Sequence, residues 1–160
     1  YAWVGYGSSY LPSDMDAAYL WAQLEGADKI NDKRLSIWNF YHEELKELED
    51  KGVLERPYIP EYATHNAHMY YIKVKDLRVR TKLLAYLKER GILSVFHYVP
   101  LHSATAGKKF GRFHGEDVYT TKESERLCRL PMYYSLSLEE AAEVVKALKE
   151  FSEYETIEDR

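Results

Sequence analysis

The stretch that decides the fold is residues 69–99, which read MYYIKVKDLRVRTKLLAYLKERGILSVFHYV. Its opening residues have the composition of a β-strand, and alternation along that strand puts Tyr70, Ile72 and Val74 on one face. The opposite face carries polar side chains, among them Lys73. This pattern predicts a strand that is buried on one side only.

In the middle of the same stretch, the spacing of the apolar residues changes from every second position to every third or fourth position. After Asp76 the apolar positions predict a helix whose inner stripe is Val79, Leu83, Leu84 and Leu87. Gly91 is expected to end that helix, and residues 92–99 to form a second strand that Pro100 terminates. Strand, helix and strand in this order indicate an α/β unit.

Two long helices are expected before this unit. Ser13 is well placed to cap the first helix, and Gly26 to break it. The second helix is predicted to end near Gly52, and its apolar side chains recur at three- and four-residue spacing: Ile30, Leu35, Trp38, Tyr41, Leu45 and Leu48.

After the second strand we expect a loop over residues 101–117, a short helix over 121–130 and an extended link over 131–134. Ser137 and Glu140 form a capping box at the start of the last helix. The inner face of that helix is predicted to be Ala141, Val144, Val145 and Leu148.

These elements together predict an α/β fold: a short sheet with helices on one face, preceded by two long helices. We divide the chain into an interdomain loop with long helices at residues 1–52, a small α/β domain at 53–154 and a frayed acidic tail at 155–160.

Composition limits the function. The 160 residues carry a net charge of -4, which disfavours nucleic-acid binding because phosphates require a basic surface. No apolar run has the length that membrane insertion needs. The single cysteine, Cys128, allows no internal disulfide, so we expect the cytoplasm as the compartment. The chain begins at Tyr1, within a glycine-rich stretch, and we interpret it as an excised piece.

The sequence offers no catalytic residue and no metal site of its own. His65 and His68 stand three apart, but no cysteine or carboxylate supplies further ligands at a useful spacing. Cys128 is predicted to be a small buried apolar residue, because a nucleophile needs a neighbouring base and an electropositive setting.

Two segments have the chemistry to hold a ligand. Gly5 to Tyr10 runs into a helix start, where backbone amides and two serine hydroxyls favour a phosphate, although a Gly/Ser loop before a helix is common. Phe96 to His102 leaves a strand, and the nearby Lys108, Lys109 and Arg112 could bind a diphosphate. A polar surface loop explains the second segment equally well.

Several motifs resemble the DegT/StrS family of aminotransferases, which act on sugar nucleotides. They are Gly7 to Ala18 followed by Gln23-Leu24, Asn66 to Ile72, Arg80, Phe96 to His102, and Leu130 to Ser137, and they follow the order expected in that family. The resemblance extends over nearly the whole chain, up to about Phe151.

The resemblance implies the C-terminal small domain of a fold-type-I aminotransferase that uses pyridoxal phosphate. It implies a homodimer, a dTDP-linked 4-keto-6-deoxy sugar as substrate and glutamate as amino donor. It places Ser8 and Ser9 near the cofactor phosphate of the partner subunit, and His97, Tyr98 and His102 on the sugar-nucleotide side of the cleft. The lysine that binds the cofactor would belong to a region upstream of Tyr1, so the 160 residues alone would be inactive.

The sequence leaves three other interpretations of the function open. The chain could be a non-catalytic module that binds a sugar or nucleotide, a dehydratase of the same fold that uses the cofactor without a lysine, or a dimerisation domain. A reactive lysine in the intact protein would separate the first two from an aminotransferase.

Overall fold

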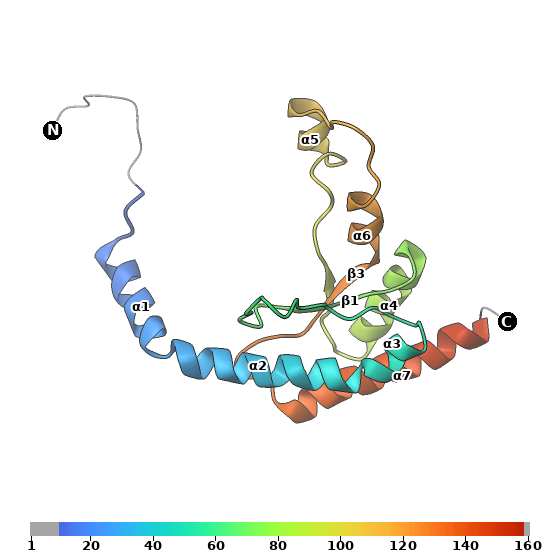
Figure 1. The fold of residues 1–160 in the computed structure, drawn as a ribbon, viewed down its shortest axis with the longest axis horizontal. Helices are drawn as coiled ribbons and strands as arrows, with labels where there is room; N and C mark the ends of the chain where they lie inside the picture. The colour runs from blue at the N-terminus through green and yellow to red at the C-terminus, as the bar shows by residue number, and fades with distance from the viewer. Residues whose placement is uncertain (1–9, 159–160) are drawn as a thin grey trace.

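A computed structural model of the chain describes residues 10–158, with the side chains of 155–158 left out. In chain order the elements are α1 (Asp14–Glu25), α2 (Ala27–Glu44), α3 (Lys46–Asp50), β1 (Tyr70–Lys73), α4 (Leu77–Glu89), β2 (Val95–Phe96), α5 (Thr105–Phe110), α6 (Thr120–Arg126), β3 (Leu127–Leu130) and α7 (Leu138–Glu158) (Figure 1). No helix among these described residues is both long enough and apolar enough to cross a membrane.

The sheet has three antiparallel strands in the order β1-β3-β2. In the register, Ile72 of β1 lies opposite Cys128 of β3, and Phe96 of β2 lies opposite the same cysteine. The predicted single helix over 121–130 is therefore wrong, since its last four residues form the central strand. A four-residue strand shows little local pattern, and hydrogen bonds from both neighbours stabilise it.

The second predicted strand is much shorter than expected. Of residues 92–99, only Val95 and Phe96 pair with β3. The residues after them turn away at Tyr98, whose φ of 54° lies in the left-handed region and cannot continue a strand.

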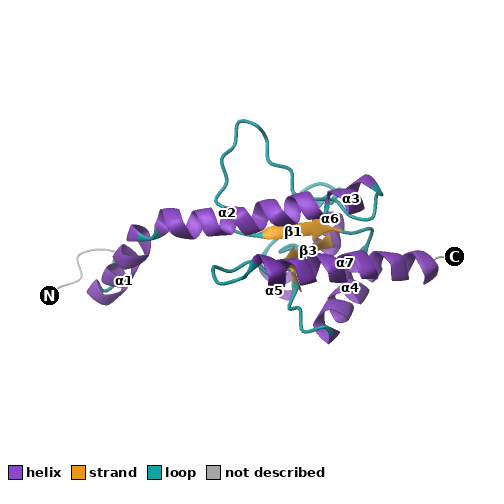
Figure 2. Cartoon of the chain, turned by 90° about the horizontal axis from the view of Figure 1, so that it is seen from below, coloured by secondary structure: helices purple, strands orange, loops and turns teal. Residues whose placement is uncertain are grey.

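One face of the sheet is covered by helices, as the sequence predicts. Figure 1 shows α2 and α7 running along the same side of the sheet, and Figure 2 shows the two helices next to each other. The buried side chains of the strands and helices form one core, which includes Ile37, Trp38, Tyr41, Tyr70, Ile72, Leu83, Leu87, Cys128, Leu130, Ala141, Val144 and Leu148.

The buried residues of α2 lie in the same core as those of the sheet. Tyr41 connects α2 to the segment that follows β3: it is fully buried, and its hydroxyl donates a hydrogen bond to the carbonyl of Pro131 at 3.1 Å. The domain boundary that we place at residue 52 stays a prediction. The frayed tail at 155–160 also stays a prediction, and helix α7 continues into this segment as far as Glu158.

The helix caps predicted at Ser13 and at Ser137 are present, and at the start of α1 the Asp16 amide donates to the Ser13 hydroxyl oxygen. Asp76 accepts a hydrogen bond from the Val79 amide at the start of α4. At α7 the capping box is complete: the Glu140 amide donates to the Ser137 hydroxyl oxygen, and the Ser137 amide donates to the Glu140 carboxylate. Such caps fix where each helix begins and therefore how its apolar stripe meets the sheet.

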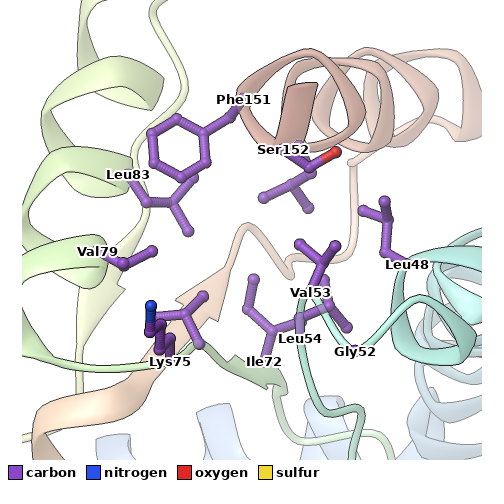
Figure 3. Close-up of a pocket in the computed structure, with 12 residues that line it drawn as sticks. Leu48, Gly52, Val53, Leu54, Ile72, Lys75, Val79, Leu83, Phe151 and Ser152 are labelled. Atoms are coloured by element: carbon purple, nitrogen blue, oxygen red, sulfur yellow. The ribbon is translucent and has the colours of Figure 1, made fainter. Parts of the chain in front are cut away.

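An apolar hollow of about 160 Å³ lies between α3, α4, α7 and β1. Figure 3 shows Leu83 and Phe151 approaching it from the helices, Val53 and Leu54 from the segment after α3, and Ile72 from the sheet. Because its lining is mainly aliphatic, this hollow is a packing feature beside the core and offers few groups that could bind a polar substrate.

Candidate functional site

The segment after β2 is held in place by two side chains from neighbouring helices. The Ser124 hydroxyl on α6 donates a hydrogen bond of 2.9 Å to the carbonyl of Tyr98. Arg80 on α4 donates to the Ser124 carbonyl at 2.7 Å, and its guanidinium lies 5.3 Å from the centre of the Phe96 ring. Arg80 and Ser124 therefore fix the course of the chain where the sequence predicts substrate contacts.

His97 and Tyr98 are adjacent in space as well as in sequence. Their rings meet edge to face with centres 5.0 Å apart, and Tyr98 is 74% exposed. The buried Nδ1 of His97 has no hydrogen-bond partner within residues 10–158. A non-glycine residue with positive φ is uncommon, and Tyr98 adopts this conformation with its side chain largely exposed.

His102 is fixed by a carboxylate and an aromatic ring. Its Nε2 lies 2.8 Å from Oδ2 of Asp117, and its ring centre is 4.4 Å from that of Phe113. The Thr121 hydroxyl and amide also donate to Asp117, and the hydrogen bond from the hydroxyl is the first cause of the lowered pKa of that carboxyl. The charged Asp117 thus joins the loop that precedes α6 to the loop that follows β2.

A hollow of about 580 Å³ opens beside His102. Its lining is mainly apolar, with Arg112 as the charged member, and consists of Leu101, His102, Ala106, Gly107, Phe110, Gly111, Arg112, Phe113 and Thr120. Of the three predicted substrate contacts His102 lines this hollow, whereas His97 and Tyr98 lie nearer to the strand. An apolar hollow with aromatic walls and a few polar groups is typical of a small-molecule site.

The residues predicted near the cofactor phosphate, Ser8 and Ser9, lie outside the described residues. The best placed lysine of the sequence, Lys73, is engaged elsewhere. Its Nζ lies 2.6 Å from Glu55 and 2.8 Å from Glu123, and hydrogen bonds to these carboxylates raise its pKa. Lys73 therefore stays protonated and does not fit the role of the lysine that binds pyridoxal phosphate, which must react as a free amine.

Cys128 and the paired histidines have structural surroundings. Cys128 is fully buried, and burial raises the pKa of its thiol to about 12, so it is no nucleophile at neutral pH. The His65 ring packs against Trp38, and its Nδ1 accepts a hydrogen bond from the Ala67 amide. Within the part of the chain that the structure describes, no three His, Cys, Asp or Glu side chains are grouped to hold a metal.

Sequence reasoning missed a second, larger hollow of about 830 Å³ at the end of β3 where Leu130 lies. It is lined by residues of α2, β2, β3, α7 and the segments beside them: Arg34, His68, Met69, Gly91, Ile92, Leu93, Val95, Arg129, Leu130, Pro131, Met132, Tyr133, Leu136, Glu140, Glu143 and Val144. Recognising 127–130 as a strand would have revealed Arg129, since alternation with the buried Cys128 and Leu130 places it on the open face of the sheet.

The strand order and the helices over one sheet face define an α/β fragment, and two of its hollows could hold a small ligand. Residues 2–149 match the DegT/DnrJ/EryC1/StrS aminotransferase family. The chain belongs to this family.

Individual relatives agree with that assignment. The chain is 32% identical to an uncharacterised protein of Methanocaldococcus jannaschii, over 89% of this chain and 37% of the relative. Among solved structures it is similar to the aminotransferase TlmJ of Streptoalloteichus hindustanus, with a TM-score of 0.74, 23% identity and coverage of 84% of this chain and 35% of that one.

A third relative is a sugar aminotransferase, described as putative, of Streptococcus pneumoniae. Its PMP form has a TM-score of 0.71 and 24% identity, over 87% of this chain and 35% of that one, and the same protein is known in a PLP form. The chain thus spans little more than a third of the length of these relatives. It matches part of a fold-type-I aminotransferase.

Proposed function

We propose that the intact protein transfers an amino group from glutamate to the 4-keto position of a dTDP-linked 6-deoxyhexose. The product would be the corresponding 4-amino sugar nucleotide, as in the family member that makes dTDP-4-amino-4,6-dideoxygalactose. The proposal rests on the family match over residues 2–149 and is supported by the hollow of about 580 Å³ beside His102.

In this proposal the small domain binds and orients the sugar nucleotide. His102 lies beside the apolar hollow, and Arg112 supplies a positive charge for a phosphate. His97 and Tyr98 face the sugar from the strand end that Ser124 and Arg80 hold in position. The aromatic lining excludes water from one side of the ligand, which strengthens its polar contacts.

Pyridoxal phosphate would supply the electron-withdrawing ring on which amino transfer depends. The described residues do not fit as a complete site for it, because Lys73 is paired with two carboxylates. Ser8 and Ser9 remain the proposed contacts to the cofactor phosphate across a homodimer. We also propose the cytoplasm as the location.

The deciding experiment is to trap the cofactor. The intact protein is incubated with pyridoxal phosphate, reduced with borohydride and digested, and labelled lysines are mapped by mass spectrometry; the 160-residue chain is the control. One stoichiometric label outside these 160 residues, with none within them, supports the aminotransferase. Absence of a specific label in the intact protein would leave the dehydratase or the binding module instead.

A further inference from the structure

The Nε2 atom of His102 faces two oxygen atoms that accept hydrogen bonds. Oδ2 of Asp117 lies 2.8 Å from it, and the hydroxyl oxygen of Thr121 lies 3.4 Å from it. A carboxylate has no proton to donate, and the Thr121 hydroxyl already donates its proton to Asp117. Nε2 therefore carries a hydrogen, because an unprotonated nitrogen would meet only lone pairs there.

Asp117 and the His102 ring are both held in orientation by neighbouring groups. Oδ1 of Asp117 accepts a hydrogen bond from the Thr121 amide at 3.2 Å, and Oδ2 accepts from the Thr121 hydroxyl. These hydrogen bonds contribute to the lowered pKa of the carboxyl, which is therefore ionised at neutral pH. The His102 ring packs against Phe113 with ring centres 4.4 Å apart and an angle of 41° between the planes.

The other ring nitrogen of His102 is left open for a ligand. Nδ1 has no hydrogen-bond partner within residues 10–158, and it is accessible, since it is not one of the buried atoms of that range that lack a partner. His102 lines the hollow of about 580 Å³. In a neutral imidazole whose proton is on Nε2, Nδ1 is an acceptor, so the group that it binds must be a hydrogen-bond donor.

This tautomer gives His102 and Arg112 different roles in the hollow. A phosphate oxygen presents lone pairs, which an accepting Nδ1 cannot bind. The Arg112 guanidinium has only donors and lines the same hollow, so it is the group suited to phosphate. On a dTDP-linked sugar the donors are the sugar hydroxyls and the imide N–H of the base.

We propose that Asp117 is a positioning residue that keeps the proton of His102 on Nε2, so that Nδ1 accepts a hydrogen bond from a donor group of the sugar nucleotide. Naming the sugar nucleotide rests on the proposed function, whereas the tautomer rests on the contacts of Asp117 and Thr121 alone. A ligand without the donor would leave Nδ1 unpaired, and a site built for a hydrogen bond discriminates against such a ligand.

The substitution D117N separates the tautomer from the shape of the side chain. The amide oxygen is expected to take the position of Oδ1, where the Thr121 amide donates to it. The amide nitrogen then replaces Oδ2 and donates to Nε2 of His102, so the imidazole proton moves to Nδ1. The variant thus turns Nδ1 from an acceptor into a donor at nearly unchanged volume.

The tautomer is measured on the intact protein with isotope-labelled histidine, from the NMR shifts of the two ring nitrogens. The signal that disappears in H102Q belongs to His102. Wild type and E116Q should carry the proton on Nε2, and D117N on Nδ1. Glu116 is the matched control, because it directly precedes Asp117, is exposed and does not line the hollow. A wild-type ring protonated on Nδ1, or on both nitrogens at neutral pH, overturns the proposal without any variant.

Ligand binding gives the second measurement, with circular dichroism to establish that each variant is folded. D117N should raise KM for the sugar nucleotide about tenfold and leave KM for glutamate the same. Calorimetry with dTDP and with the dTDP-sugar identifies the donor: weaker dTDP binding in D117N assigns the imide N–H of the base, and a loss confined to the dTDP-sugar assigns a sugar hydroxyl.

A dTDP-sugar that binds wild type and folded D117N equally, or that fails to bind the wild type, overturns the contact with Nδ1. The tautomer does not depend on amino transfer. Absence of a trapped lysine would therefore refute the aminotransferase and leave the role of Asp117 in orienting His102 standing.

Discussion

At the residue scale, the candidate site depends on backbone positions where side-chain size is constrained. Gly107 in α5 is the tightest: a Cβ there would lie 1.7 Å from the carbonyl oxygen of Leu101. The backbone of α5 is thus pressed against the turn that presents His102. This contact explains how a short helix can form one wall of the hollow.

We therefore expect G107A to displace α5 from that turn. The substitution should lower the free energy of local opening by about 1–3 kcal/mol, because backbone atoms must move to admit the methyl group. Hydrogen exchange of the amides in 101–110 measures this. G26A is the control, since its Cβ would lie 3.7 Å from the nearest atom. Equal exchange in both variants would contradict the close approach.

A second prediction at this scale concerns acid. Hydrogen bonds from Lys73 are the first cause of the lowered pKa values of Glu55 and Glu123. A carboxyl with a lowered pKa stabilises the fold above its ordinary value of 4.5, and that stability is lost as the pH falls through the folded-state pKa.

E123Q should therefore reduce the unfolding free energy at neutral pH by about 0.5–1 kcal/mol, a modest change because the pair is partly exposed. The loss should disappear in acid, where the wild-type carboxyl is protonated as well. Urea unfolding at a series of pH values measures the loss of unfolding free energy at neutral pH and in acid, with E61Q on an exposed loop as the reference. A constant difference at all pH values would refute the ion-pair explanation.

At the element scale, sequence patterns predicted the elements whose signals are local. Three kinds of local signal are confirmed: the apolar stripe of α4, the caps at Ser13 and Ser137–Glu140, and the alternating burial of β1. The central strand β3 was not predicted, because four residues carry too little periodicity and their stability comes from pairing with β1 and β2. Arg129 was missed for the same reason.

The capping box of α7 gives a test at the scale of one element. S137A removes the hydroxyl that accepts from the Glu140 amide, and it should destabilise the protein by about 1 kcal/mol. Because α7 packs beside α2, the loss should appear in global unfolding and not only as fraying of one helix. Thermal and urea unfolding measure it. S135A, at an exposed position before the cap, should be near neutral; equal losses would argue against the box.

At the scale of the whole molecule, the candidate site lies in the loop that follows the short strand β2. Helices cover one face, while the open face carries Arg129, and the loop after β2 carries His97, Tyr98 and His102. The sequence located this loop from its polar residues at a strand end, as α/β proteins generally arrange their sites. It could not show that Asp117 and Thr121 hold His102, because these contacts join segments far apart in the chain.

The contacts of His102 give a prediction for the binding of the sugar nucleotide. H102N removes the ring that packs on Phe113 and weakens the contact with Asp117, so it should disturb the hollow of about 580 Å³ while leaving Arg129 unchanged. In the intact protein, KM for the sugar nucleotide should rise about tenfold, equivalent to ~1.4 kcal/mol of binding.

The half-reaction with glutamate should proceed in H102N at the wild-type rate, because His102 is proposed to contact the sugar nucleotide and not the amino donor. H114N provides the matched control: His114 is exposed and does not line the hollow beside His102, so both steps should be unaffected. A fall in the glutamate half-reaction equal to the loss for the sugar would mean that His102 serves both substrates. The assignment of His102 to the sugar nucleotide alone would then be wrong, even with the family assignment intact.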